Sequence, residues 1–433
     1  MKNIKYISLV FVLLFSFNSI AQQTPADPQN EVITITGATA HLGNGQVIEN
    51  SIITFENGKI TAVADATTAK ISGSGKVIDA TGKHVYPGFI TANSSLGLVE
   101  VNAVRASNDS REIGDLIPHV RSLIAYNAES KVVESMRPNG VLMAQVSPKG
   151  GRISGTSSVV QFDAWNWEDA AVKVDDAIHL NWPSSFSRGR WWLGEPRGWK
   201  PNKNYKNQVN ELRTFLQQAK TYSKGSKSPR NLPYEATLGL FDGSQKIFMN
   251  AASEQEITDA VHFAKSMGID HIVIVGGYHA YKVSDLLKKH NVAVLTNRTH
   301  TNPSSEDDDY DFVYKMPKML ADSGVLVGIQ TGDASNFQTR NLPFYAGQIA
   351  GQGLNKEEAL KLITSNTAKI LGIDKDYGTL EVGKSATLFI SEGDALDMKT
   401  NVLTHAFIDG RMISLETHQT KLHKRYSEKY SKE

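Results

Sequence analysis

Three ionisable side chains lie directly after apolar stretches. Asp333 ends the stretch VGIQTGD, His279 follows HIVIVGG, and His300 follows VAVLTN. The end of a buried strand suits a reactive group, because the strand fixes the side chain while the loop leaves it accessible. A carboxylate and an imidazole placed there can act as general base and general acid or bind a divalent metal. We therefore predict Asp333, His279 and His300 as catalytic residues. In the plainer interpretation, the aspartate caps the next helix and the histidines are simply exposed.

A second candidate cluster is the segment RGRWWLGEPRGW, which spans residues 188–199. A guanidinium offers a planar fork to a carboxylate, and an indole offers a large face for stacking. These properties predict a ligand-binding role for Arg188, Arg190, Trp191 and Trp192. The alternative is that the same side chains pack this segment against the rest of the protein.

Two further motifs have structural interpretations. The run SSEDDDYD at residues 304–311 could gather a hard cation through its oxygens, but it leads into a helical pattern, where acidic residues favour the helix N-terminus. The stretch KGGRISG at residues 149–155 contains glycines but lacks the GK[ST] ending of a phosphate-binding loop. We interpret the first as a helix start and the second as a turn.

The N-terminus has the pattern of a secretory signal. Two lysines precede an apolar run, and small residues follow at Ser19 and Ala21, which predicts a signal peptide over residues 1–21. With 46 basic and 45 acidic residues, the chain shows no charge excess that would favour nucleic acid or an anionic membrane. It has no cysteine, and therefore no disulfide and no thiol for a lipid anchor. We expect a periplasmic or extracellular protein without a membrane anchor.

Both ends of the mature chain have the alternating pattern of short strands with glycine turns. Residues 22–85 contain VITITGATAH and SIITFENG, and residues 376–415 contain GTLEVGKSATLFISEG. We expect these two parts to form one small β-sandwich. Residues 416–433 are polar and form a predicted solvated tail.

The middle of the chain, residues 86–375, alternates apolar strands with helices. One helix is expected from Glu254, with Ser253 as N-cap, Glu256 three residues later and Gly268 as terminator. Continuous apolar strands between helices are typical of a buried parallel sheet, and this alternation indicates an α/β fold. Seven strands can be recognised. Residues 178–232 show no strand pattern and are interpreted as an insertion that hides or displaces an eighth.

Four stretches, in chain order, resemble the amidohydrolase superfamily, and in particular its imidazolonepropionase-like members. They are VIDATGKHVYPGFIT at residues 77–91, VGIQTGD at 327–333, GLNKEEALKLITSNTAKILG at 353–372 and GTLEVGKSATLFI at 378–390. The resemblance implies a (β/α)8 TIM-like barrel with a small β-sandwich formed by both chain ends. It also implies a metal-dependent hydrolase that acts on non-peptide carbon–nitrogen bonds. The metal would lie at the carboxyl ends of the barrel strands.

The metal-binding positions of this family are changed here. Its strand-one His-x-His falls on Asn93 and Ser95 in PGFITANSSLG, its strand-five histidine on Asn250 and its strand-six histidine on Gly276. Only the strand-eight aspartate is kept, as Asp333. Neutral amides and hydroxyls are weak zinc ligands, so we expect at most one weakly held divalent metal, zinc, on Asp333. Asn93, Ser95 and Asn250 are predicted to line a ligand pocket instead.

Two classes of function remain open from the sequence. In the first, the protein hydrolyses a small amide or peptide-like molecule with Asp333 and either His279 or His300. In the second, it is a non-catalytic pseudoenzyme that binds a ligand or supports a partner, as a homo-oligomer or beside a complete homologue. A carbohydrate- or peptide-capturing module built on the segment 188–199 is one form of the second class.

Overall fold

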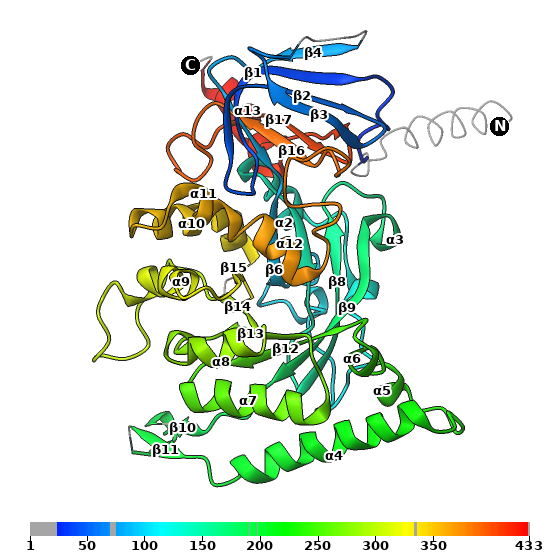
Figure 1. The fold of residues 1–433 in the computed structure, drawn as a ribbon, viewed down its shortest axis with the longest axis vertical. Helices are drawn as coiled ribbons and strands as arrows, with labels where there is room; N and C mark the ends of the chain where they lie inside the picture. Colours follow the sequence, from blue (N-terminus) through cyan, green and yellow to red (C-terminus); the bar gives the residue numbers. More distant parts are fainter. Residues whose placement is uncertain (1–23, 70–74, 190, 197, 333–335, 432–433) are drawn as a thin grey trace, which may run out of the picture.

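The computed structural model describes residues 24–69, 75–189, 191–196, 198–332 and 336–431. An eight-stranded sheet occupies one end of the molecule, and a second eight-stranded sheet with surrounding helices forms the rest (Figure 1). This confirms the predicted α/β fold with a barrel and a separate β unit. Within the described ranges, no helix combines the length and apolar character that a membrane crossing needs. The predicted signal peptide lies outside these ranges.

The end sheet combines strands from both parts of the chain. Its order is β18-β17-β16-β5-β1-β2-β3, with β4 paired to β1. The strands are β1 (Ile33–His41), β2 (Val47–Glu56), β3 (Lys59–Asp65), β4 (Lys76–Asp79), β5 (His84–Pro87), β16 (Leu388–Ser391), β17 (Leu403–Ile408) and β18 (Arg411–Met412). Its own apolar core includes Ile35, Phe55, Leu388 and Phe407. The two chain ends therefore share one buried core.

The turn between β2 and β3 shows how local sequence fixes this sheet. Asn57 and Gly58 have φ angles of +50° and +77°, the left-handed region that a tight hairpin turn requires. Asparagine tolerates this region and glycine adopts it freely. The Asn-Gly pair therefore sets the antiparallel register of the two strands.

The second sheet forms the barrel. Its strands are β6 (Phe89–Ser94), β7 (Val141–Val146), β8 (Ile153–Gln161), β9 (Ala171–Asn181), β12 (Lys246–Ala251), β13 (Ile272–Gly276), β14 (Ala293–Thr296) and β15 (Val327–Ile329). Neighbours pair in the order β15-β14-β13-β12-β9-β8-β7-β6. A bridge between Ala92 and Gln330 joins the two edge strands and closes the ring. The carboxyl ends of β6 and β15 are thereby brought together.

One barrel strand runs against the others. β8 is antiparallel to both β7 and β9, whereas the remaining neighbours pair in parallel. The connection from β7 to β8 covers only residues 147–152, too short for the crossover of about a dozen residues that a parallel pair needs. Gly150 and Gly151, with φ of +84° and +61°, make the reversal possible. The uniformly parallel sheet expected from the sequence is therefore interrupted at this strand.

The strand that the sequence did not reveal is β9, and the segment 178–232 begins inside it. Lys173, Asp175 and Asp176 break its apolar pattern, so it does not look like a buried strand. The rest of the segment forms a two-stranded hairpin, β10 (Phe186–Arg188) with β11 (Trp199–Pro201), and the long helix α4 (Tyr205–Lys224).

Helices cover the outside of the barrel (Figure 1). The predicted capping box of α7 (Glu254–Met267) is present, with Ser253 and Glu256 bonded reciprocally and Gly268 at φ +78° ending the helix. The remaining helices are α2 (Lys131–Glu134), α3 (Trp167–Ala170), α5 (Leu232–Glu235), α6 (Gly239–Asp242), α8 (Ser284–Lys289), α9 (Phe312–Asp322), α10 (Leu342–Gly351), α11 (Lys356–Lys361), α12 (Ser365–Leu371) and α13 (His418–Tyr430).

Candidate functional site

Amide side chains gather at the carboxyl ends of the barrel strands. Asn93 lies at the end of β6 and Asn250 at the end of β12, where its partner across the sheet is Asn181 of β9. Asn297 follows β14 and Gln330 follows β15. In a closed barrel these strand ends converge on one point. The mouth of this barrel is therefore lined with neutral groups that both donate and accept hydrogen bonds.

A chain of hydrogen bonds fixes several of these amides. Asn93 Nδ2 donates to Gln330 Oε1 at 3.0 Å, and Gln330 Nε2 donates to Asn297 Oδ1 at 2.5 Å. The Asn93 backbone N–H donates to Gln145 Oε1 at 3.0 Å, and Gln145 Nε2 donates to the buried Asp176 at 2.7 Å. Burial raises the pKa of Asp176. The network leaves each amide a defined orientation.

A small cavity opens beneath these strand ends. Its volume is roughly 50 Å³, enough for one or two water molecules or a small polar group. Asn181 Nδ2 donates to the Gly151 carbonyl at 2.8 Å and to Ser154 Oγ at 3.1 Å. The cavity is lined by Asn93, Pro148, Lys149, Gly150, Ser154, His179, Leu180, Asn181, Phe248, Asn250 and Val275.

His179 projects from β9 into this cavity and is 6% exposed. Its Nε2 atom has no hydrogen-bond partner within the described part of the protein. Burial, assisted by the nearby Lys149 ammonium, lowers the pKa of His179 to about 3. The imidazole is therefore neutral at pH 7. The sequence interpretation missed this residue because β9 itself was not recognised.

Lys149 brings positive charge to the barrel mouth. It lies in the loop after β7, and its Nζ donates to the Asn93 carbonyl at 3.4 Å and the Gly332 carbonyl at 3.3 Å. A side chain at Gly332 would collide with this ammonium. KGG was interpreted as a turn, and it is one, but the turn also places the Lys149 ammonium against the ends of the first and last barrel strands.

The residues at the family's metal positions do not fit a zinc centre. Asn93 and Asn250 are neutral, and Ser95 Oγ donates to Asn336 Oδ1 at 2.6 Å. Gly276 has φ +87°, a backbone conformation that residues other than glycine rarely adopt. Among the described residues, no three His, Asp or Glu side chains gather where they could hold a metal. Asp333, the predicted aspartate ligand, lies outside the described residues.

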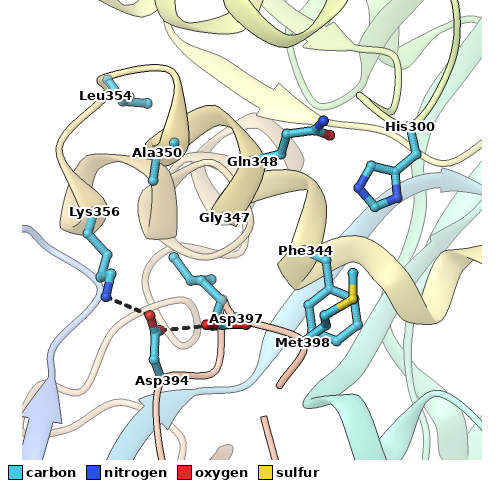
Figure 2. Close-up of a pocket in the computed structure, with 12 residues that line it drawn as sticks. His300, Phe344, Gly347, Gln348, Ala350, Leu354, Lys356, Asp394, Asp397 and Met398 are labelled. Carbon is cyan, nitrogen blue, oxygen red and sulfur yellow. Dashed lines mark hydrogen bonds and ion pairs between the residues drawn. The ribbon is translucent and has the colours of Figure 1, made fainter. Parts of the chain in front are cut away.

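The predicted histidines line other cavities. His279 faces a cleft near the β10–β11 hairpin, and burial lowers its pKa. His300 lines a pocket of about 680 Å³ between α10 and residues 394–398, where Lys356 and Asp394 form an ion pair (Figure 2). The His300 ring packs edge-on against Tyr345, and burial lowers its pKa. The structure thus brings Asn93 and Asn250 together at one cavity and leaves both histidines outside it.

The tryptophan and arginine cluster forms the tip of the hairpin. Arg188 and Trp199 are partners across the β10–β11 pair, with the guanidinium carbon 5.8 Å from the ring centroid. Trp191 and Trp192 lie in a short 3-10 turn and are 57% and 66% exposed. Neither lines the cavity at the barrel mouth. Arg190 lies outside the described residues.

Comparison with known proteins places the fold. The model of the amidohydrolase family matches residues 241–413. A solved amidohydrolase from Thermotoga maritima MSB8 is similar with a TM-score of 0.78 and 23% identity, over 88% of this chain and 99% of that one. The comparison with curated protein sequences gives no match.

More distant structures have the same fold. An Xaa-Pro dipeptidase with bound methionine has a TM-score of 0.52 and 14% identity, over 88% of this chain and 100% of that one. Phenylurea hydrolase B has a TM-score of 0.52 and 12% identity, over 89% of this chain and 97% of that one. The resemblance to the amidohydrolase superfamily is confirmed, and by family and fold the protein resembles its hydrolases.

Proposed function

We propose that this protein, an amidohydrolase-like barrel, binds the amide group of a small amide or peptide-like ligand in the roughly 50 Å³ cavity at its barrel mouth, with the rest of the ligand outside the cavity, without a metal centre and without hydrolysing it. The observation that carries the proposal is the chemistry of the lining. The sequence resemblance aligns Asn93 and Asn250 with imidazoles of the family, both line this cavity, and the Lys149 ammonium lies between the first and last barrel strands. Neutral amides match the hydrogen-bonding pattern of an amide ligand, donor against acceptor.

Lys149 argues against a divalent cation at the same place. Its ammonium donates to two backbone carbonyls and has no lone pair with which to bind a metal. Among the described lining residues, the family's usual route to hydrolysis, a water activated by a metal, therefore has no counterpart.

A metal-free hydrolase is the second candidate, and the unpartnered Nε2 of His179 favours it. His179 lines the cavity, and this atom is buried without a hydrogen-bond partner among the described residues. However, a general base works best when its pKa is near the working pH, and the pKa of His179 is lowered to about 3. Such an imidazole accepts a hydrogen bond at pH 7 but is too weak a base to take a proton efficiently. The low basicity of His179 therefore favours ligand binding over hydrolysis.

The first test combines metal analysis with ligand titration. After dialysis against zinc or manganese and then buffer, the purified mature chain should retain far less than one metal per molecule. Calorimetry with an Ala-Pro dipeptide and a phenylurea should detect binding, and chromatography should recover both probes intact. Asn250→Ala should weaken binding about tenfold, the effect of one lost hydrogen bond.

The matched control is Asn210→Ala, which changes an exposed asparagine of α4 and should leave affinity unchanged. Stoichiometric zinc that is retained by the wild type and lost in Asp333→Ala would contradict the metal-free mouth. Steady release of product from either probe would contradict the non-catalytic role. Failure to bind both probes would reject the ligand class.

Export is a separate part of the proposal. The signal pattern of residues 1–21 supports cleavage after Ala21. Expressed in full in a bacterium, the protein should appear outside the cytoplasm, and intact-mass analysis should show a chain that begins at Gln22. A chain without residues 1–21 is the control and should stay in the cytoplasm. A full-length mass in the exported fraction would contradict cleavage there.

A further inference from the structure

A larger cleft lies on the same face of the barrel, apart from the cavity at its mouth. Its volume is about 520 Å³, within the range of small-molecule sites. The β10–β11 hairpin, the start of α7 and the loops after β13 and β14 form its walls, and the hairpin and the loop before α9 lie on the same side of the molecule (Figure 1). We call it the outer cleft. It is lined by Ser184, Ser185, Phe186, Trp199, Ala252, Ser253, Glu256, Tyr278, His279, Ser304, Ser305 and Asp308.

Three aromatic side chains line the outer cleft. Trp199 is 65% exposed and Phe186 is 45% exposed, and Tyr278 lies opposite them on the loop after β13. Exposed rings that gather around one cavity are characteristic of ligand-binding surfaces, because they offer large contact area at low entropic cost. The cleft is therefore shaped for a ligand with an apolar body.

The charge of the outer cleft is negative. Asp308 and Glu256 line it, and among its described lining residues there is no lysine or arginine. Asp308 Oδ2 accepts from Tyr278 Oη at 2.6 Å and from the Ser305 N–H at 3.1 Å, and no described hydrogen bond uses its Oδ1. Glu306, Asp307 and Asp309 are exposed on the same loop and add to the negative potential. These carboxylates favour a positive group in the cleft, against the positive charges of Arg188 beside Trp199 and Lys282 near His279.

Hydrogen bonds hold both walls in place before any ligand arrives. Glu256 Oε1 accepts from Ser184 Oγ at 3.0 Å and from the Ser185 N–H at 2.8 Å, which fixes the base of the hairpin on α7. On the other wall, the Ser304 N–H donates to Tyr278 Oη at 2.9 Å. A preformed cleft binds more tightly because less ordering is needed on binding.

We propose that the outer cleft binds an organic cation, a protonated or quaternary amine attached to an apolar body. The positive group would lie against the rings of Trp199 and Phe186, with the Asp308 carboxylate as its counter-ion. The Arg188 guanidinium already lies over the Trp199 ring, 5.8 Å from its centroid, so the positive group of the ligand would use the other face of that ring. Glu256 already accepts several hydrogen bonds, which leaves Asp308 Oδ1 as the carboxylate oxygen without a described hydrogen bond. This inference does not rest on the proposed function of the barrel mouth.

The test compares choline with 3,3-dimethyl-1-butanol, its neutral isostere, by calorimetry on the full mature chain. Choline should bind at least about tenfold more tightly than the isostere, and its affinity should fall as salt is raised. Trp199→Ala and Asp308→Asn should each weaken choline binding about tenfold.

Two matched variants control for general effects. Trp165→Ala removes another exposed tryptophan, and Asp307→Asn removes a charge from the same loop outside the cleft lining. Both should bind choline within about twofold of the wild type, and circular dichroism should confirm that every variant folds. Equal affinity for choline and its isostere, or no choline binding, would overturn the proposal. Binding of cellobiose that depends on Trp199 would assign the cleft to a sugar instead.

Discussion

Lowering the pH from 7 to 5 should lower the free energy of unfolding of the wild type by about 2 kcal/mol more than that of His179→Gln. The pKa of His179 is lowered to about 3 in the folded protein, because the ring is buried and lies near the Lys149 ammonium, whereas the unfolded chain has the ordinary value of 6.5. Below pH 6.5 the unfolded state takes up a proton that the folded state refuses, so stability falls with pH. At pH 5 the solution is roughly 1.5 pH units below the unfolded-state pKa of 6.5, and each unit lowers the free energy of unfolding by about 1.4 kcal/mol.

Urea denaturation of both proteins at pH 7 and pH 5 measures this difference. Burial also lowers the pKa values of His84, His279 and His300, so the wild type and the variant both lose some stability in acid. The difference between the two proteins gives the contribution of His179 alone to the pH dependence of the free energy of unfolding, because the other histidines are present in both. His423→Gln, on the exposed tail helix α13, is the matched control. Identical pH dependence in the wild type and His179→Gln would mean that the imidazole is hydrated and titrates freely.

Elements with strong local signals could be predicted from the sequence. The capping box of α7 and the Asn57–Gly58 hairpin were both readable, because each depends on a few residues close in the chain. The pairing of the two chain ends in one fold followed from their matching patterns of short strands and glycine turns, and the resemblance also implied it. The reversed strand β8 could not be read in this way, because only the short connection through Gly150 and Gly151 reveals its direction.

The candidate site was harder to predict than the fold, since it depends on residues that look ordinary along the chain. His179 lies in a strand disguised by Asp175 and Asp176, and Asp176 is tolerated inside the barrel because Gln145 and Ser157 donate hydrogen bonds to it. Lys149 follows β7 by a few residues, and nothing in the local sequence indicates that its ammonium contacts the ends of β6 and β15. Both assignments needed the pairing of distant strands.

Backbone conformation restricts which of the positions aligned with the family's imidazoles could carry a histidine. Asn93 has φ +50° and Gly276 has φ +87°. Asparagine and histidine are both among the residues that tolerate the left-handed region, whereas the φ angle of Gly276 is one that residues other than glycine rarely adopt. A histidine at Gly276 would therefore strain the strand end, whereas the backbone at Asn93 would accept one.

The second large effect is expected where the barrel meets the end sheet. Asp163 is 2% exposed and lies just after β8, and its Oδ2 pairs with Arg411 Nη1 of β18 at 3.0 Å. The same oxygen accepts from the Ala26 N–H at 3.1 Å, and the Arg411 Nη2 donates to the Asp163 carbonyl at 2.9 Å. The buried Arg137 also lies in the field of this carboxylate, which opposes the lowering of its pKa by burial. One carboxylate thus compensates two guanidinium groups.

Asp163→Ala should therefore lower the free energy of unfolding by about 3–5 kcal/mol, the usual result of leaving a buried charge without its partner. Urea denaturation at pH 7 measures it. The matched control is Asp376→Ala, which breaks the exposed 2.7 Å pair with Lys59 and should cost less than about 1 kcal/mol. Adding Arg411→Met to Asp163→Ala should recover part of the loss, because the second change removes the uncompensated charge. A loss below about 1 kcal/mol in Asp163→Ala would mean that water reaches the pair and that apolar packing, rather than this carboxylate, holds the sheet on the barrel.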